Sequence, residues 1–185
     1  MNTHNLRRQM LATLLVASFG ALAAATEPGK PLTLFEAMKD TVVPKSQVIW
    51  DITNAAQDDT GNVTAKALKA GDWAKIASAA RESSQAVRSL LAQSRVVAAP
   101  PGRKIQGEGT PGAFGAREVQ QTIDANPAAF AAFAKQLLAA TDGMVAATKA
   151  HDAPRIGTLA GDLDEICEAC HKVFWYPKQA PPPHK

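Results

Sequence analysis

Apolar residues along most of this chain recur every three or four positions, the spacing that places them on one face of an α-helix. Four stretches show this pattern, at 34–56, 72–94, 127–151 and 153–176. No stretch shows the strict alternation of apolar and polar residues that a half-buried strand would have. Because short connections separate amphipathic helices, the pattern predicts an all-α protein, specifically an antiparallel four-helix bundle.

The ends of these stretches carry residues that favour helix starts. Thr33 and Glu36 have the spacing of a capping box before the first helix. The expected N-caps of the second, third and fourth helices are Asp72, Asn126 and Asp152. Pro44 interrupts the first stretch, and because proline has no N–H to donate, a kink or two helical pieces are expected there.

The predicted inner face of each helix follows from the same spacing. In the first helix it comprises Leu34, Phe35, Met38, Val42, Val48, Ile49, Ile52 and Ala56; in the second Trp73, Ile76, Ala80, Ser83, Val87, Leu90 and Leu91; in the third Phe130, Phe133, Leu137, Leu138, Met144 and Val145; and in the fourth Ile156, Leu159, Leu163, Ile166, Cys167, Cys170, Val173 and Phe174.

Two segments fall outside the helical pattern. Residues 98–116 hold five glycines and three prolines, which predicts a long loop and surface excursion without regular structure. A short helix at 116–124 follows it. Residues 177–185, with three consecutive prolines, predict a disordered Pro-rich tail, so the folded domain is expected to span 26–176.

The first 25 residues have the features of a secretory signal peptide, with cleavage expected after Ala25. Arg7 and Arg8 precede an uncharged apolar run that ends in small residues. That run is too short to span a bilayer, so no membrane anchor is expected. The predicted destination is an oxidising compartment outside the cytoplasm, a bacterial periplasm.

The net charge of the mature chain argues against one class of partner. The chain has 20 basic and 17 acidic residues, but removal of Arg7 and Arg8 with the signal peptide leaves 18 basic against 17 acidic. A nearly neutral mature chain without a basic and aromatic pattern argues against nucleic acid as a partner.

The residues with the most distinctive chemistry are Cys167, Cys170 and His171, in the string Cys-Glu-Ala-Cys-His. This spacing is that of covalent c-type haem attachment. On a helix the three side chains project from one face, so two thiols can reach the two vinyl groups of a porphyrin and the imidazole can bind the iron. The other interpretations are a zinc half-site, a redox dithiol or a disulfide. The chain has no further cysteine for a zinc site and no βαβ pattern for a thioredoxin-type dithiol.

A helical chain with this motif near the end of its last helix resembles the class II c-type cytochromes, the cytochrome c prime family. The aromatic residues Phe174, Trp175 and Tyr176 and the segment from Met38 through Pro44 to Trp50 add to the resemblance. It implies one haem c per chain, held by Cys167 and Cys170 inside the bundle near one end, with His171 as the proximal iron ligand. The long loop at 98–116 departs from the compact family pattern.

The sixth iron ligand decides between functions. The resemblance points to Met38, while an ordinary core methionine is the alternative. Met144 is a weaker candidate because it lies late in the third helix. His151 and His184 are expected to face solvent. Lys172 and Lys178 have the charge to pair with haem propionates, but a lysine near a helix C-terminus is also favourable with the dipole alone.

The expected function is therefore that of a periplasmic c-type cytochrome that transfers single electrons between redox partner proteins and is not an enzyme. If Met38 does not bind, the alternative is a five-coordinate haem protein that takes up nitric oxide or carbon monoxide. A second alternative is a haem-bearing interaction module without turnover. The resemblance also allows a homodimer.

Overall fold

The computed structural model of this chain describes residues 31–177, so the predicted signal peptide and residues 178–185 of the predicted tail lie outside the described part. Within that part the chain is all-α, as predicted, and its one β feature is an isolated bridge between Gln57 and Val63. The elements are α1 (Leu34–Ala37), the π-helical segment η1 (Met38–Val42), α2 (Val43–Ala55), α3 (Ala70–Leu91), α4 (Ala116–Ala125), α5 (Pro127–Ala150) and α6 (Ala153–Phe174).

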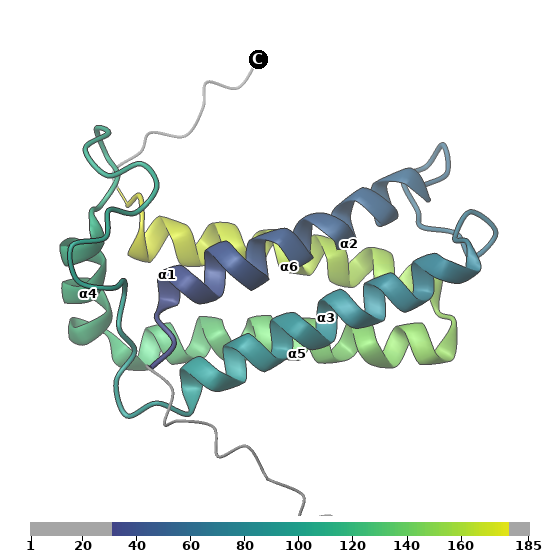
Figure 1. The fold of residues 1–185 in the computed structure, drawn as a ribbon. Helices are drawn as coiled ribbons and strands as arrows, with labels where there is room; N and C mark the ends of the chain where they lie inside the picture. The colour runs from purple at the N-terminus through teal and green to yellow at the C-terminus, as the bar shows by residue number, and fades with distance from the viewer. Residues whose placement is uncertain (1–30, 178–185) are drawn as a thin grey trace, which may run out of the picture. The chain divides into compact units, whose positions relative to one another are not determined.

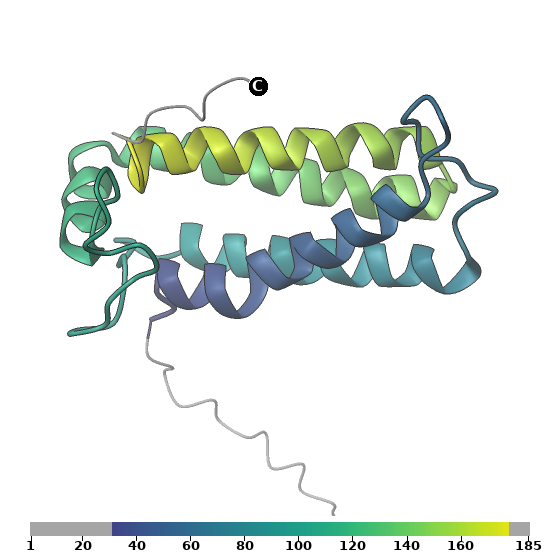
Figure 2. The ribbon, with the colours of Figure 1, turned by 90° about the horizontal axis from the view of Figure 1, so that it is seen from above.

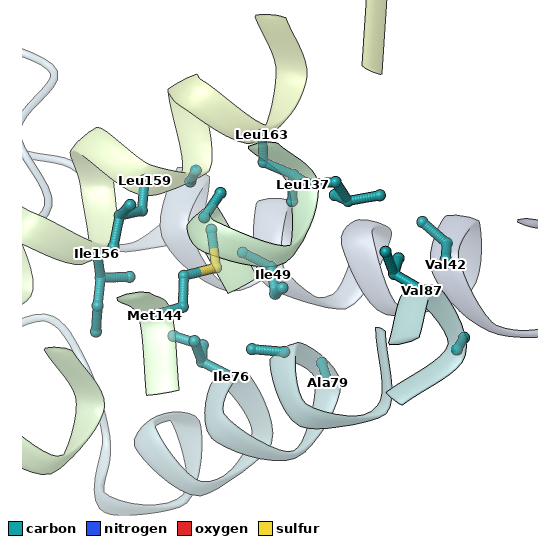
Figure 3. Close-up of a cluster of buried hydrophobic side chains, with 14 of the residues drawn as sticks. Val42, Ile49, Ile76, Ala79, Val87, Leu137, Met144, Ile156, Leu159 and Leu163 are labelled. Atoms are coloured by element: carbon teal, nitrogen blue, oxygen red, sulfur yellow. The ribbon is translucent and has the colours of Figure 1, made fainter. Parts of the chain in front are cut away.

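The long helices pack around a shared apolar interior. α3 packs against α5, α5 against α6, and α2 against both α3 and α6 (Figures 1 and 2). Consecutive long helices run in opposite directions, and α4 packs against α5 and α6 at the end of α6 that carries the motif (Figure 1). Figure 3 shows the middle of this interior, where apolar side chains from α2, α3, α5 and α6 meet.

The first helix begins as expected. Thr33 Oγ1 accepts a hydrogen bond from the Glu36 N–H at 3.2 Å, and the Glu36 carboxylate accepts one from the Thr33 N–H at 3.0 Å, which confirms the predicted capping box. The interruption predicted near Pro44 takes the form of the π-helical segment just before it. There the Val43 N–H donates to the Met38 carbonyl, five residues back instead of four.

The predicted inner face of the first helix is only partly right. The buried residues of 34–56 are Ala37, Val42, Ser46, Ile49, Thr53 and Ala56. Val48, predicted to be inside, is 36% exposed. The Thr53 side chain can be buried because its hydroxyl is satisfied locally: Thr53 Oγ1 donates to the Ile49 carbonyl at 3.0 Å. A pattern that counts only apolar residues misses such positions.

Of the caps predicted for the later helices, Asp72 was wrong in role. The second helix begins at Ala70, and Asp72 is its third residue, where its carboxylate accepts from the Lys69 N–H at 2.9 Å. Asn126 is the N-cap residue of the third long helix, with Pro127 in its first turn, as predicted, but its side chain makes no capping bond to α5 and donates instead to the Thr122 carbonyl of α4 at 3.1 Å. Asp152 is confirmed as a cap, because its carboxylate accepts from the Arg155 N–H at 3.0 Å.

Two glycines of α6 provide a direct test of the packing between α6 and the segment after α2. A Cβ at Gly157 would lie 3.0 Å from Val63 Cγ2, whereas a Cβ at Gly161 would meet nothing within 4 Å. We expect Gly157→Ala to lower the free energy of unfolding by about 1 kcal/mol through overpacking. The matched control, Gly161→Ala, should raise it by up to about 1 kcal/mol through helix propensity.

Urea denaturation of the two variants measures this difference. Equal stability gains in both variants would show that Val63 does not pack closely on Gly157.

Candidate functional site

The motif residues lie on the last two turns of α6, on the face that continues the buried stripe of the helix. Ile156 and Leu163 on this face are completely buried. Further along the same face, Cys167, Cys170 and His171 are only half-buried. The inner face of α6 is therefore less covered by protein at the motif than along the rest of the helix.

The end of α6 is nevertheless held firmly on α5. Phe174 is buried, and its ring makes edge contacts with Phe130 and Phe133, with centroid distances of 5.6 and 6.3 Å. Such edge-to-face pairs are favourable beyond their buried area. The aromatic residue three positions after His171 thus fixes the helix that presents the motif.

A single cross-helix hydrogen bond sets the level of α2 against α6. Trp50 Nε1 donates to the Ala160 carbonyl at 3.1 Å. From this point Met38 lies about 18 Å along the first helix, and His171 about 16 Å along α6, at 1.5 Å of rise per residue. Because the two helices are antiparallel, both residues lie toward the same end (Figure 1). The structure therefore brings the predicted ligands Met38 and His171 to matching levels.

At that level the backbone of the first helix does not approach α6 as closely as α2 does. α2 is in contact with α6, but no Cα atom of α1 or η1 lies within 8 Å of a Cα atom of α6. Leu34 and Met38 are half-buried and pack at the border of the core, as do Cys167 and Cys170. The half-buried motif face and the half-buried start of the first helix thus lie at the same end of the interior, without a close approach of their backbones.

The thiols are free and remain protonated at neutral pH. Burial, with a smaller effect of the Asp164 carboxylate, raises the pKa of Cys167 to about 11. Burial and the neighbouring Cys167 raise the pKa of Cys170 to about 12. A reactive redox dithiol needs a lowered thiol pKa, so the direction of both shifts disfavours that interpretation.

His171 lies in an aromatic and acidic surrounding. Its ring contacts those of Trp175 and Tyr176, with centroid distances of 4.8 and 5.7 Å. The Tyr176 hydroxyl donates to the Glu168 carboxylate, which also pairs with Lys172 at 3.1 Å. Burial lowers the pKa of His171 against the opposing effect of Glu168, so the imidazole is favoured in the neutral form that can bind a metal.

Met144, another candidate ligand, lies far from the motif. Met144 is completely buried beside Ile49, Ile76 and Ile156, in the middle of the interior (Figure 3). Ile156 is about 22 Å along α6 from His171. Met144 is therefore a core residue, not a ligand at this site.

The remaining candidates from the sequence are two histidines and two lysines. His151 is exposed at the turn before α6, with its ring 4.8 Å from that of Trp73, at the far end from the motif. Its predicted solvent exposure is confirmed. Lys172 pairs with Glu168, while His184 and Lys178 lie outside the described residues.

The long loop predicted at 98–116 has no helix or strand as far as residue 115, but it is not simply a surface excursion. The Leu34 and Phe35 N–H groups donate to the Val97 and Ala98 carbonyls, both at 2.8 Å, and Ala98 is buried. Glycine and proline content predicted the irregular backbone but could not show that it contacts the start of the first helix.

The same loop contacts the end of α6. Trp175 Nε1 donates to the Gln106 carbonyl at 2.9 Å, and the Phe114 N–H donates to the Trp175 carbonyl at 2.7 Å. Gln106 and Glu168 are the residues at this site that sequence reasoning missed. Their contacts join chain positions without any shared spacing or motif, so no sequence pattern could have indicated them.

The donor set fits a c-type haem better than a zinc ion. Two thiols and one imidazole project from one helical face, and apolar side chains of the first helix lie at the same level. Among residues 31–177 no group of three or more His, Cys, Asp or Glu side chains converges as a metal ion would need. A structural zinc site requires four such ligands.

Comparison with protein-family models, curated proteins and solved structures found no match for this chain. Between residues 31 and 177, no helix combines the length and apolar character that a membrane-spanning segment needs.

Proposed function

We propose that this protein is a c-type cytochrome that binds one haem covalently and transfers single electrons. The observation that carries the proposal is the half-buried face of α6 at Cys167, Cys170 and His171, at a level where every Cα atom of α1 and η1 lies more than 8 Å from those of α6. Protonated, partly buried thiols on one face are the groups that add to haem vinyls, and the neutral imidazole is positioned one residue further.

The helical arrangement supports the corresponding architecture, a four-helix bundle formed by α2, α3, α5 and α6. Each of these helices packs on two of the others in a closed ring, and consecutive members are antiparallel. The motif on the final turns of α6 would place a bound haem near one end of this bundle, next to the start of the first helix.

When bound, the haem would supply an iron that alternates between the ferrous and ferric states. The chain's own residues would hold the haem, orient the iron ligand and shield the site from water. Cys167 and Cys170 would fix the haem edge, His171 would bind the iron, and Phe174 keeps this helix end on α5. Apolar neighbours such as Leu34 would limit water access, which favours a defined potential.

Met38 is the residue that would decide how the iron is used. It lies at the level of His171 and, as a thioether, would raise the potential and close the sixth position. A protein with both ligands bound fits an electron carrier that meets its redox partner proteins in the periplasm. Without Met38 bound, an open site under apolar side chains would suit nitric oxide or carbon monoxide.

The proposal is tested by producing the chain in a host with a c-type haem assembly system. The expected product carries one haem per chain that survives acid–organic extraction, and its reduced spectrum is low-spin and unchanged by carbon monoxide. A high-spin ferrous spectrum that changes at once with carbon monoxide would favour the gas-binding function. A chain that leaves this host without covalent haem would refute both.

A further inference from the structure

The segment between α3 and α4 joins the two parts of the molecule that carry the proposed iron ligands. Its first anchor is the pair of hydrogen bonds from the Leu34 and Phe35 N–H groups to the carbonyls of Val97 and Ala98. These residues begin the helix that carries Met38. The Arg103 guanidinium over the Phe35 ring, 5.8 Å from its centroid, adds a second contact on this side.

Its second anchor is Trp175, at the end of α6. The Trp175 side chain donates to the Gln106 carbonyl, and its backbone carbonyl accepts from Phe114. The two bonds hold one residue from two positions of the loop, eight residues apart. A residue held at both its side chain and its backbone cannot rotate freely.

Trp175 in turn contacts His171. The N–H groups of Trp175 and Tyr176 both donate to the His171 carbonyl, at 2.8 and 2.9 Å, so the chain folds back tightly at the helix end. This turn places the Trp175 ring edge-on to the imidazole, at 4.8 Å and 81°. The orientation of the imidazole is therefore restricted by a ring that the loop itself holds.

We infer that residues 97–115 act as a strap that sets the orientation of His171 through Trp175 and its separation from the first helix. No Cα atom of α1 or η1 lies within 8 Å of one of α6, so these loop contacts are the described hydrogen-bonded link between the two ligand-bearing segments at this end. Trp175 is a positioning residue, not a ligand. The role toward haem rests on the proposed function, whereas the coupling of loop and helix end does not.

The experiment compares Trp175→Phe with Trp73→Phe. Both tryptophans lie 4.8 Å from a histidine ring, but Trp73 contacts His151 at the opposite end of α6. Trp175→Phe keeps a ring against His171 and removes the indole N–H that binds the loop. In the haem-free chain, amide hydrogen exchange of residues 103–115 should become about fivefold faster, the factor expected for one lost hydrogen bond. Trp73→Phe should leave these amides unchanged.

In the haem-loaded chain, proton NMR of the haem methyl groups reports the plane of the axial imidazole. Trp175→Phe should shift these resonances and Trp73→Phe should not. Tyr176→Phe, which loses only the hydroxyl bound to Glu168, should leave exchange of the loop amides unchanged and so separates the strap from general packing around His171.

Equal exchange in Trp175→Phe and Trp73→Phe would overturn the strap, as would unshifted haem resonances in Trp175→Phe. A wild-type chain that takes up no haem would instead refute the proposed function, and the exchange comparison would then decide the strap by itself.

Discussion

Replacing Cys167 and Cys170 together with alanine is expected to abolish covalent haem attachment completely. The two thiols are the only ones in the chain, so no other side chain can form a thioether bond. Each single replacement should leave one bond and a weaker but measurable haem content. Haem that remains on the chain after acid–organic extraction, read as the mass of one haem per chain, provides the measurement.

The same double variant should change the haem-free fold little. Both thiols are half-buried and small, so we expect a loss of about 1–2 kcal/mol in the free energy of unfolding. His171→Ala is the matched control, because it keeps both thiols and removes the iron ligand. Covalent haem that persists in the double variant would contradict the attachment site, whatever the spectrum shows.

Replacing Met144 with alanine is expected to cost about 3 kcal/mol of stability, within the range measured for buried large-to-small changes. The reason is that Met144 is completely buried among isoleucines of three other helices, where neighbours cannot collapse into the space (Figure 3). Met38→Ala, at a half-buried border position, should cost about 1 kcal/mol. Urea denaturation of the two haem-free variants measures the difference.

The haem-loaded spectra should show the opposite order of effects, with the larger change in Met38→Ala. Met38→Ala is expected to convert a low-spin spectrum to a high-spin one that responds to carbon monoxide, whereas Met144→Ala should leave the spectrum unchanged. A spectrum that changes in Met144→Ala and not in Met38→Ala would mean that the level matching between Met38 and His171 has no ligand significance.

The helices could largely be predicted from sequence because period and capping act over a few residues. The capping box at Thr33 and the cap at Asp152 are local hydrogen bonds, and both were confirmed. Asp72 was assigned the wrong role because an acidic side chain near a helix start can be the N-cap or, as here, bind the N-cap N–H from the third helical position. Asn126 holds the predicted cap position, but its side chain binds the preceding helix instead. Thr53 was missed because its burial depends on an internal hydrogen bond that an apolar count ignores.

Only the covalent chemistry of the site could be predicted from the sequence. The spacing of Cys167, Cys170 and His171 indicates haem attachment directly, since the chemistry requires that spacing. The surroundings of His171 could not be predicted, because Gln106 and Trp175 are 69 positions apart and meet only through the tertiary fold. Loop composition at 98–116 indicated irregular backbone but contained no information about its anchors.

The π-helical segment at Met38–Val42 has a consequence for the angular phase of the first helix. Buried positions after it follow the heptad steps of four and three, at Val42, Ser46, Ile49 and Thr53, but the step from Ala37 to Val42 is five. If this helix were α-helical throughout, the residues before Val42 would be turned about the helix axis by roughly 100° from their present direction, because each residue of an α-helix corresponds to about 100°. The one extra residue in the π-helical turn thus changes the angular position of the residues before Val42. The direction of the Met38 side chain is therefore set separately from that of the buried residues that hold α2 in the core.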